Sequence, residues 1–315
     1  MHFYGREHFV AESHNLGISV QIDSQNLQNP KPDCFSDLAS ISECDVILLT
    51  VKATAIPELQ AELSQRVRPQ VPIIALQNGV GVSAMIAEKL TNPIYRAIVP
   101  FNVIKKTPAL FCKATSGALL WPQTDDVNLN FLQKTWLKQG LAVQQISDVK
   151  AVEFGKLLLN LNNALNALSD LPLKQRLLNR ALRRVLADAM AEWLLVCDAF
   201  AVKPYRFAKV PVHWLPHILR APTPIFQLLA KQMLGIAPDA RSSMWDDFKA
   251  GRASEIHFLN GAVVSLGRQV AVATPINAAI VKLVLKREAE RQQGILSSVM
   301  TPEQLVQWLR EQSTN

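Results

Sequence analysis

The chain has 315 residues, 49% of them hydrophobic and 19% charged, a composition typical of a globular protein and not of a disordered one. No run reaches the roughly 18 apolar residues that a membrane span needs, and the N-terminus has no signal-peptide pattern. We therefore expect neither a membrane protein nor an exported one. The formal net charge of +7 is modest and dispersed, so we expect no nucleic-acid partner. A mild positive charge of this kind is equally compatible with a small anionic ligand.

The cysteines are widely scattered and form no C-x-x-C pair. They are Cys34, Cys44, Cys112 and Cys197. This spacing argues against a zinc site and for small core residues in a reducing compartment, so we expect a cytoplasmic protein without a metal.

The first half of the chain alternates short apolar runs with helical patterns. The predicted strands are ISVQI (18–22), DVILLTV (45–51), PIIAL (72–76) and YRAIVPFNVI (95–104), with shorter ones at 119–121 and 141–147, and the predicted helices are 57–67 and 82–90. Strands separated by helices imply βαβ units and a parallel sheet. The run VILLT is apolar on both faces, as a sheet covered by helices on each side requires.

From about residue 150 the pattern becomes helical, with apolar residues three and four positions apart. Helices are predicted over 177–202, 254–270 and 274–292, the last with Thr274 as N-cap and a proline at its first position. The Pro-rich passage 203–226 reads as a connecting loop with short helices, the alternative being a membrane-surface element. We therefore predict an α/β domain over 1–148 and an all-α domain over 149–315.

The stretch VEFGKLLLNLNNALNALSDLPL (152–173) is a leucine-rich helical pattern that carries one lysine and four asparagines. At about 100° per residue, Glu153, Lys156, Asn160 and Asn163 fall within a sector of roughly 80°. Asparagine is a poor helix former, so this clustering has a cost that packing does not explain. A polar stripe lining a ligand cleft would explain it. The alternative is a helix whose amides bind neighbouring backbone groups.

Polar residues follow two of the predicted strands. Lys52 comes just after one strand, and Asn78 and Gly79 follow the next. In open parallel sheets, ligands bind beyond the carboxyl ends of the strands, so these residues point to one cleft. The alternatives are a solvated lysine and an ordinary turn. In SSMWDDFKAGRASEIHFLNG (242–261), Ser254 reads as a helix N-cap with Glu255 favoured by the helix dipole.

These motifs together resemble the ketopantoate reductase (2-dehydropantoate 2-reductase) family over nearly the whole chain. The matching segments are VKA (51–53), QNGVG (77–81), the K-x-x-x-N of Lys156 and Asn160, SSM-x-x-D followed by SEI, and ATPIN (273–277). The resemblance implies a Rossmann-like α/β domain followed by a helical substrate and dimerisation domain. It also implies an oxidoreductase that reduces ketopantoate to pantoate with NADPH, in the pantothenate branch leading to coenzyme A. A homodimer is a further expectation.

The resemblance also implies roles for individual residues. Lys156 would be the general acid that protonates the ketone oxygen, and Glu255 would pair with substrate or with Lys156 and fix the geometry. Asn160 would orient the substrate hydroxyl groups, and Ser243 would bind the substrate carboxylate.

Three further residues are implied near the cofactor. Lys52 and Asn78 would lie close to the nicotinamide and the substrate. HFYGRE resembles the end of the family's second strand, where Arg6 would meet the 2′-phosphate of NADPH, and an arginine there favours NADP over NAD.

The chain also departs from the family pattern. Ala164 stands where the family commonly has another asparagine, and His257 stands where an aspartate is frequent; we expect that histidine on a helix surface. No G-x-G-x-x-G follows a strand, so the first strand, its phosphate-binding turn and the first helix are expected to be missing. That first strand would be central, so the segments around Arg6 and 18–22 should be cut off from the remaining sheet. Two alternatives stay open: a related 2-oxo acid reductase, and a non-catalytic remnant with a dimerising or regulatory role.

Overall fold

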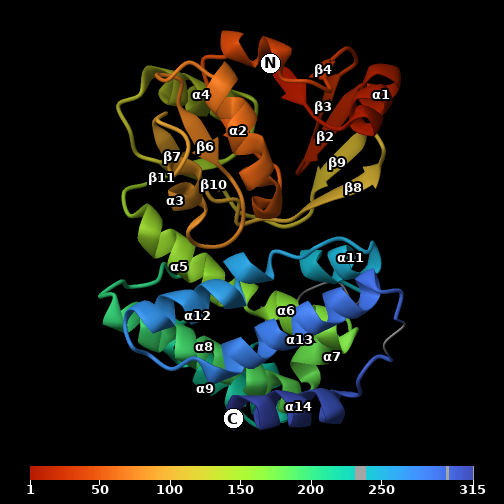
Figure 1. The fold of residues 1–315 in the computed structure, drawn as a ribbon, viewed down its shortest axis with the longest axis vertical. Coiled ribbons are helices and arrows are strands. Elements are labelled where there is room, and N and C mark those ends of the chain that lie inside the picture. Colours follow the sequence, from red (N-terminus) through yellow and green to blue (C-terminus); the bar gives the residue numbers. More distant parts are fainter. Residues whose placement is uncertain (231–238, 296–297, 315) are drawn as a thin grey trace. The chain divides into compact units, whose positions relative to one another are not determined.

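The computed structural model describes residues 1–230, 239–295 and 298–314, and it consists of two compact units (Figure 1). The first unit contains all the strands found among the described residues, and it comprises residues 1–51, 55–77 and 82–149. The second unit is helical and comprises residues 150–315 together with the short segments 52–54 and 78–81. The predicted architecture, an α/β part followed by an all-α part, is confirmed.

The main sheet of the first unit is parallel, as predicted. Strands β5 (Ile47–Leu49), β6 (Ile73–Ala75) and β7 (Ile94–Arg96) pair in that order. They alternate with helices α2 (Ile56–Arg66) and α3 (Val82–Ala87). All three residues of β6 are fully buried, because a central parallel strand is covered on both faces.

The remaining strands form separate sheets. Strand β1 (His2–Tyr4) pairs in parallel with β4 (Asp33–Phe35), and helix α1 (Glu7–Leu16) lies between them in sequence. Strand β2 (Ile18–Ile22) forms a four-stranded sheet in the order β3-β2-β9-β8. The segments around Arg6 and 18–22 thus lie outside the β5-β6-β7 sheet, as expected. The other bounds are β3 (Gln25–Asn29), β8 (Val103–Thr107), β9 (Leu110–Lys113), β10 (Leu119–Pro122), β11 (Val143–Ile146) and α4 (Val127–Lys138).

One predicted strand of this unit is wrong in its extent. The run 95–104 is divided between β7 and β8, and Pro100 lies in the interruption. Proline has no backbone N–H to donate to a ladder, so it does not continue a paired strand. Helix α4 was not predicted, although Asp126 caps it by accepting a 3.0 Å hydrogen bond from the backbone N–H of Leu129.

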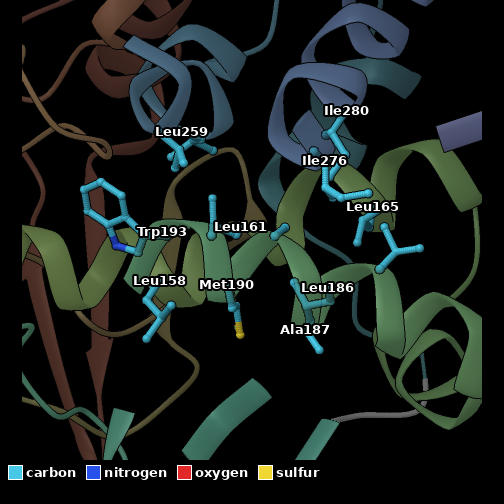
Figure 2. Close-up of a cluster of buried hydrophobic side chains, with 14 of the residues drawn as sticks. Leu158, Leu161, Leu165, Leu186, Ala187, Met190, Trp193, Leu259, Ile276 and Ile280 are labelled. Atoms are coloured by element: carbon cyan, nitrogen blue, oxygen red, sulfur yellow. The ribbon is translucent and has the colours of Figure 1, made fainter. Parts of the chain in front are cut away.

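The core of the second unit lies where four helices meet. These are α5 (Val149–Asn160), α6 (Asn162–Ser169), α8 (Arg180–Ala199) and α13 (Pro275–Gln292). Figure 2 shows Leu158 of α5 and Leu165 of α6 with Met190 and Trp193 of α8 and Ile276 and Ile280 of α13. The Trp193 indole N–H donates to the Phe154 carbonyl at 2.9 Å, which satisfies the polar atom of a buried tryptophan. The other helices are α7 (Leu173–Leu178), α9 (Leu215–Arg220), α10 (Thr223–Leu229), α11 (Ser243–Lys249), α12 (Asn260–Gln269) and α14 (Pro302–Thr314).

The Pro-rich passage is a connection with short helices, as predicted. It contains a 3₁₀ turn at Val212–Trp214, followed by α9 and α10. Leu215, Leu219 and Phe226 are buried in the helical core. The continuation of this passage over 231–238, for which the sequence suggested no role, lies outside the described residues.

Two predicted helices are wrong in their extent. The run 152–173 is interrupted at Leu161, which separates α5 from α6, and α6 ends at Asp170 in the left-handed conformation (φ 53°). The run 254–270 begins instead with a 3₁₀ turn at Ile256–Phe258, and α12 starts only at Asn260. Ser254 therefore does not cap an α-helix; its hydroxyl accepts a 3.4 Å bond from the Ile256 backbone N–H.

Helix α13 starts at Pro275 with Thr274 at the N-cap position, as predicted, but the threonine side chain makes no capping bond. The buried carboxylate of Glu192, on α8, accepts from the backbone N–H groups of Ile276 at 2.7 Å and Asn277 at 3.0 Å. It also accepts from the Asn277 side-chain amide at 2.7 Å. Burial raises the pKa of Glu192 despite these three donors. A remote carboxylate thus replaces the local cap.

No helix in the described part of the chain combines the length and hydropathy that a bilayer crossing requires. All four cysteines are free thiols. Burial raises the pKa of the Cys197 thiol above its ordinary value, which fits a small core residue rather than a nucleophile.

Arg176, on α7, is fully buried, and its three guanidinium nitrogens have no hydrogen-bond partner within the described chain. Burial, with a smaller contribution from the charge of Arg183, lowers the pKa of Arg176 to about 9. A buried charge without a partner costs several kcal/mol. We therefore expect Arg176→Met to raise the free energy of unfolding by about 1–4 kcal/mol, measured by thermal and urea unfolding.

The pH dependence of that gain has a defined sign. The folded chain holds this proton more weakly than the unfolded chain, so the penalty is complete below pH 9 and fades as the pH rises above it. The stability difference should be constant from pH 6 to 8. Arg183→Met is the contrasting variant. Arg183 donates to the carbonyls of Leu177 and Leu219 at 2.9 and 3.1 Å, so its replacement should destabilise the folded protein. A less stable Arg176→Met protein would contradict the expectation.

Candidate active site

The segment that follows β5 is held by two acidic residues of the helical unit. The Lys52 ammonium forms an ion pair with the Asp247 carboxylate on α11. The backbone N–H of the next residue, Ala53, donates to Glu255 Oε1 at 3.1 Å. Asp247 is almost completely buried and also accepts from Arg252 Nε at 3.1 Å. Two cations therefore balance one buried carboxylate, and Glu255 is fixed against the Lys52 segment.

The segment that follows β6 packs closely on the backbone near Glu255. Gly79 has φ 93°, and a Cβ atom added there would lie 2.6 Å from Phe258 Cβ and 2.9 Å from the Phe258 carbonyl carbon. The Val80 backbone N–H donates to the Phe258 carbonyl at 3.2 Å. Glycine is needed here for both reasons. Asn78 is thereby brought next to the segment that carries Glu255.

Ser243 is the exposed first residue of α11, one turn before Asp247. The preceding serine builds the turn: Ser242 Oγ accepts from the Trp245 backbone N–H and donates to the Asn163 carbonyl at 3.2 Å. The Ser242 backbone N–H donates to Asn166 Oδ1 at 2.8 Å. Helix α6 therefore fixes the start of α11 and leaves the Ser243 hydroxyl available to a ligand.

Lys156 and Asn160 lie one turn apart on α5, and both are half-buried. Asn160 Nδ2 is buried and has no hydrogen-bond partner within the part of the chain that the structure describes. Leu161, the next residue, shares the core cluster with Leu259, which follows the Glu255 segment (Figure 2). An unpaired amide donor one helical turn from a lysine suits an oxygen-rich ligand.

The asparagines of this stretch divide into different roles. Asn166 is fully buried, and its amide bridges the Ser242 backbone N–H and the Leu171 carbonyl, the latter at 2.6 Å. Asn163 offers its carbonyl to Ser242. The alternative in which the amides bind neighbouring backbone groups therefore holds for Asn166, and the polar stripe lining a ligand cleft stays a prediction. Ala164 is fully buried, and His257 is exposed on a 3₁₀ turn rather than on an α-helix.

Four of the residues predicted for the site come together in the helical unit. Lys52, Asn78, Ser243 and Glu255 are linked through the contacts with Asp247, Ala53 and Phe258. Lys156 and Asn160 lie on α5 of the same unit, and Leu161, which follows α5, belongs to the same buried core cluster as Leu259.

Arg6 belongs to the first unit. It is exposed, follows β1 and stands at the N-cap position of α1.

Asp247 was not predicted as a residue of the site. Its signal was present, because Asp247 is the aspartate of the SSM-x-x-D motif. What could not be read is its partner, Lys52, which lies 195 positions away in the sequence. The same charges act on the neighbouring Asp246. Burial raises the pKa of Asp246 and the charge of Asp247 adds to this rise, whereas the charges of Arg252 and Lys52 oppose it.

These groups can perform a limited set of reactions. An ammonium and an amide one turn apart can bind a carbonyl oxygen and donate a proton to it. A serine hydroxyl at a helix start can bind a carboxylate. No group of three or more metal-ligating side chains occurs among the residues described.

Two models of one protein family match the chain. The model described as "Ketopantoate reductase PanE/ApbA" matches residues 1–126, and "Ketopantoate reductase PanE/ApbA C terminal" matches residues 148–288.

Individual relatives agree with the family models. The chain is 27% identical over 220 residues to a 2-dehydropantoate 2-reductase of Pyrobaculum aerophilum, covering 69% of each chain. It is 23% identical over 251 residues to one of Aquifex aeolicus, covering 78% of this chain and 76% of the other. Among solved structures, a PanE/ApbA family ketopantoate reductase from Ralstonia eutropha superimposes with a TM-score of 0.76 at 24% identity, covering 91% of this chain and 90% of the other. D-mandelate dehydrogenase with NADH and anilino(oxo)acetate superimposes with a TM-score of 0.72 at 17% identity, covering 92% and 91%. The chain therefore belongs to the ketopantoate reductase family of oxidoreductases.

Proposed function

We propose that this protein reduces 2-dehydropantoate to pantoate with NADPH. The observation that carries the proposal is the grouping of Lys52, Ser243 and Glu255 in the unit whose helix α5 bears Lys156 and the orphaned amide of Asn160. A 2-oxo acid offers a ketone oxygen, a carboxylate and, in this substrate, a hydroxyl group, which together match these donors.

In this reaction Lys156 donates a proton to the ketone oxygen as that oxygen becomes an alcohol. Its positive charge also stabilises the developing alkoxide, and such proton transfer contributes about 10²–10⁴-fold. Asn160 donates its unpaired N–H to a substrate oxygen, and Ser243 binds the carboxylate. Glu255 holds the segment after β5 through Ala53 and thereby positions Lys52.

Support for a nicotinamide cofactor comes from the relatives and from Arg6. Two similar structures are of D-mandelate dehydrogenase with NADH. When bound, the cofactor supplies the hydride that reduces the ketone carbon. Arg6, at the turn from β1 to α1, is an exposed guanidinium at a helix start, an arrangement that suits a phosphate group. Lys52 and Asn78 would face the nicotinamide.

The test is the oxidation of NADPH by the purified chain, followed by absorbance, with a panel of 2-oxo acids. We expect 2-dehydropantoate to give the highest kcat/KM, ahead of 2-oxoisovalerate, pyruvate and phenylglyoxylate. A second candidate, reduction of another 2-oxo acid, is favoured by Ala164 and His257, which differ from the family pattern. A higher kcat/KM with another member of the panel would replace the first candidate. No oxidation with any member would indicate the non-catalytic alternative.

We expect Arg6→Ala to raise KM for NADPH by about 10–100-fold and to leave KM for NADH unchanged, because a charge-assisted hydrogen bond contributes about 1.5–3 kcal/mol. The side chain is exposed and makes no capping bond, so the fold should not change. Arg66→Ala is the matched control, since Arg66 is an exposed arginine of the same unit. Equal effects on both cofactors would remove Arg6 from phosphate recognition.

A further inference from the structure

A pocket lies on the helical unit, on a different side of α11 from Ser243 and Asp247. Its volume is about 230 Å³, and it is formed by residues of α6, α11 and α13 together with residues that follow α13. Its apolar lining includes Ala167, Leu168 and Phe248, which are nearly buried. None of the residues assigned above to catalysis or to substrate and cofactor binding lines it.

The acidic residue of this pocket is already neutralised. Asp170 accepts from the Trp245 indole N–H at 2.5 Å and from Lys249 Nζ at 2.9 Å, and Arg241 Nη1 lies 3.7 Å away. Bonds to Trp245 and Lys249, with the charges of Lys249 and Arg241, hold the pKa of Asp170 below its ordinary value although burial opposes this. Asp170 is thus ionised, and the positive charges of Lys249 and Arg241 balance its negative charge.

Two arginines on α13 leave the pocket with a positive excess. Arg287 and Arg291 are four residues apart, so they lie on one face of the helix. Arg287 is paired with Glu290 at 3.4 Å and donates to the Ser298 carbonyl at 3.1 Å. The Arg291 guanidinium lies 5.2 Å from the centre of the Phe248 ring. Arg291 therefore places a positive charge at the pocket, and the contact described for its guanidinium is with the ring of Phe248.

The geometry points to a binding site for a compact organic carboxylate with an apolar or aromatic body. The body would occupy the lining of Ala167, Leu168 and Phe248, and the carboxylate would pair with Arg291 and Arg287. A guanidinium fork matches a planar carboxylate in two parallel hydrogen bonds. The volume limits the ligand to about the size of a single ring with its carboxylate. Such a ligand would bind apart from the catalytic residues and independently of the proposed reaction.

The test uses the full chain and isothermal titration calorimetry with benzoate, benzamide and inorganic phosphate. Benzamide keeps the ring and removes the charge, and phosphate keeps the charge and removes the ring. We expect benzoate to bind in the millimolar range and each of the other two at least fivefold more weakly. Arg291→Gln should weaken benzoate binding at least fivefold. Arg268→Gln, at an exposed arginine of α12 outside the pocket, should leave it unchanged.

A second measurement locates the ligand. The indole N–H of Trp245 donates to Asp170 at the edge of the pocket, so its NMR resonance, assigned with Trp245→Phe, should shift on addition of benzoate. The proposal is overturned if benzoate does not bind at tens of millimolar, if benzamide or phosphate binds as well, if Arg291→Gln binds it normally, or if the Trp245 resonance stays in place. Reduction of 2-oxo acids plays no part in these measurements, so failure here leaves the proposed function standing.

Discussion

Lys156→Ala is expected to lower kcat for 2-dehydropantoate reduction by about 10²–10⁴-fold, because it removes both the proton donor and the charge that stabilises the alkoxide. The expected change in KM is smaller, since Asn160 and Ser243 still bind the substrate. Steady-state oxidation of NADPH gives both constants. Lys156→Arg should also be slow, because a guanidinium keeps the charge but does not release a proton near neutral pH.

The matched control is Lys150→Ala, on the same helix. The Lys150 ammonium lies 5.6 and 5.3 Å from the ring centres of Phe154 and Phe200, so it packs on aromatic faces. Its loss should reduce stability slightly and leave turnover unchanged. If Lys156→Ala kept more than about a tenth of the wild-type kcat, Lys156 would not be the general acid. NADPH binding, measured by fluorescence, should be the same in all three variants.

Gly155→Ala is expected to destabilise the helical unit by about 2–4 kcal/mol. Helix propensity alone predicts the opposite, because alanine is favoured over glycine by about 1 kcal/mol in a helix interior. The backbone around Gly155 decides the sign. A Cβ atom there would lie 2.8 Å from the Tyr205 backbone nitrogen and 3.0 Å from its carbonyl carbon. The Tyr205 N–H also donates to the Ala151 carbonyl at 2.8 Å, so the added methyl group would force these backbones apart.

Thermal unfolding followed by circular dichroism measures this loss. Gly81→Ala is the comparison: Gly81 has φ 89°, but an added Cβ would have no atom within 4 Å. That variant should lose only about 1 kcal/mol, the cost of the left-handed backbone. If Gly155→Ala were as stable as the wild type, the close approach of residue 205 to α5 would be incorrect. Because Gly155 precedes Lys156, a displaced helix should also lower turnover.

Elements with a strong local pattern could be predicted from the sequence. The strands β5 and β6 are continuous apolar runs, and α13 has both a periodic pattern and Pro275 at its start. Their buried faces are specified by the residues themselves. By contrast, β1 and β4 are three residues long and owe their structure to each other. Neither strand has a local apolar pattern of its own, and β1 was indicated only through the resemblance of HFYGRE to the end of the family's second strand.

The candidate site was predictable in its residue types but not in its contacts. The polar positions after two strands and along α5 were visible as departures from apolar patterns. The bond from Ala53 to Glu255 joins residues 202 positions apart, and no local rule specifies such a pair. Asn166 illustrates the same limit: its cost in helix propensity was visible, but its partner Ser242 lies on α11. Helix propensity indicates that a buried asparagine requires a hydrogen-bond partner, but only the tertiary fold shows which residue that partner is.

The carboxylate of Glu192 at the start of α13 bears on how the C-terminal part of the protein can be dissected. A fragment beginning after α8 would retain the sequence of α13 but lose the acceptor for three of its donors. Its first turn would then fray in water, and the Asn277 amide would lose its bonds to Glu192 and to the Ala189 carbonyl of α8 while keeping the one from Asn260. Pieces cut between α8 and α13 should therefore lose cooperative unfolding, whereas a cut ahead of α5 keeps these two helices together.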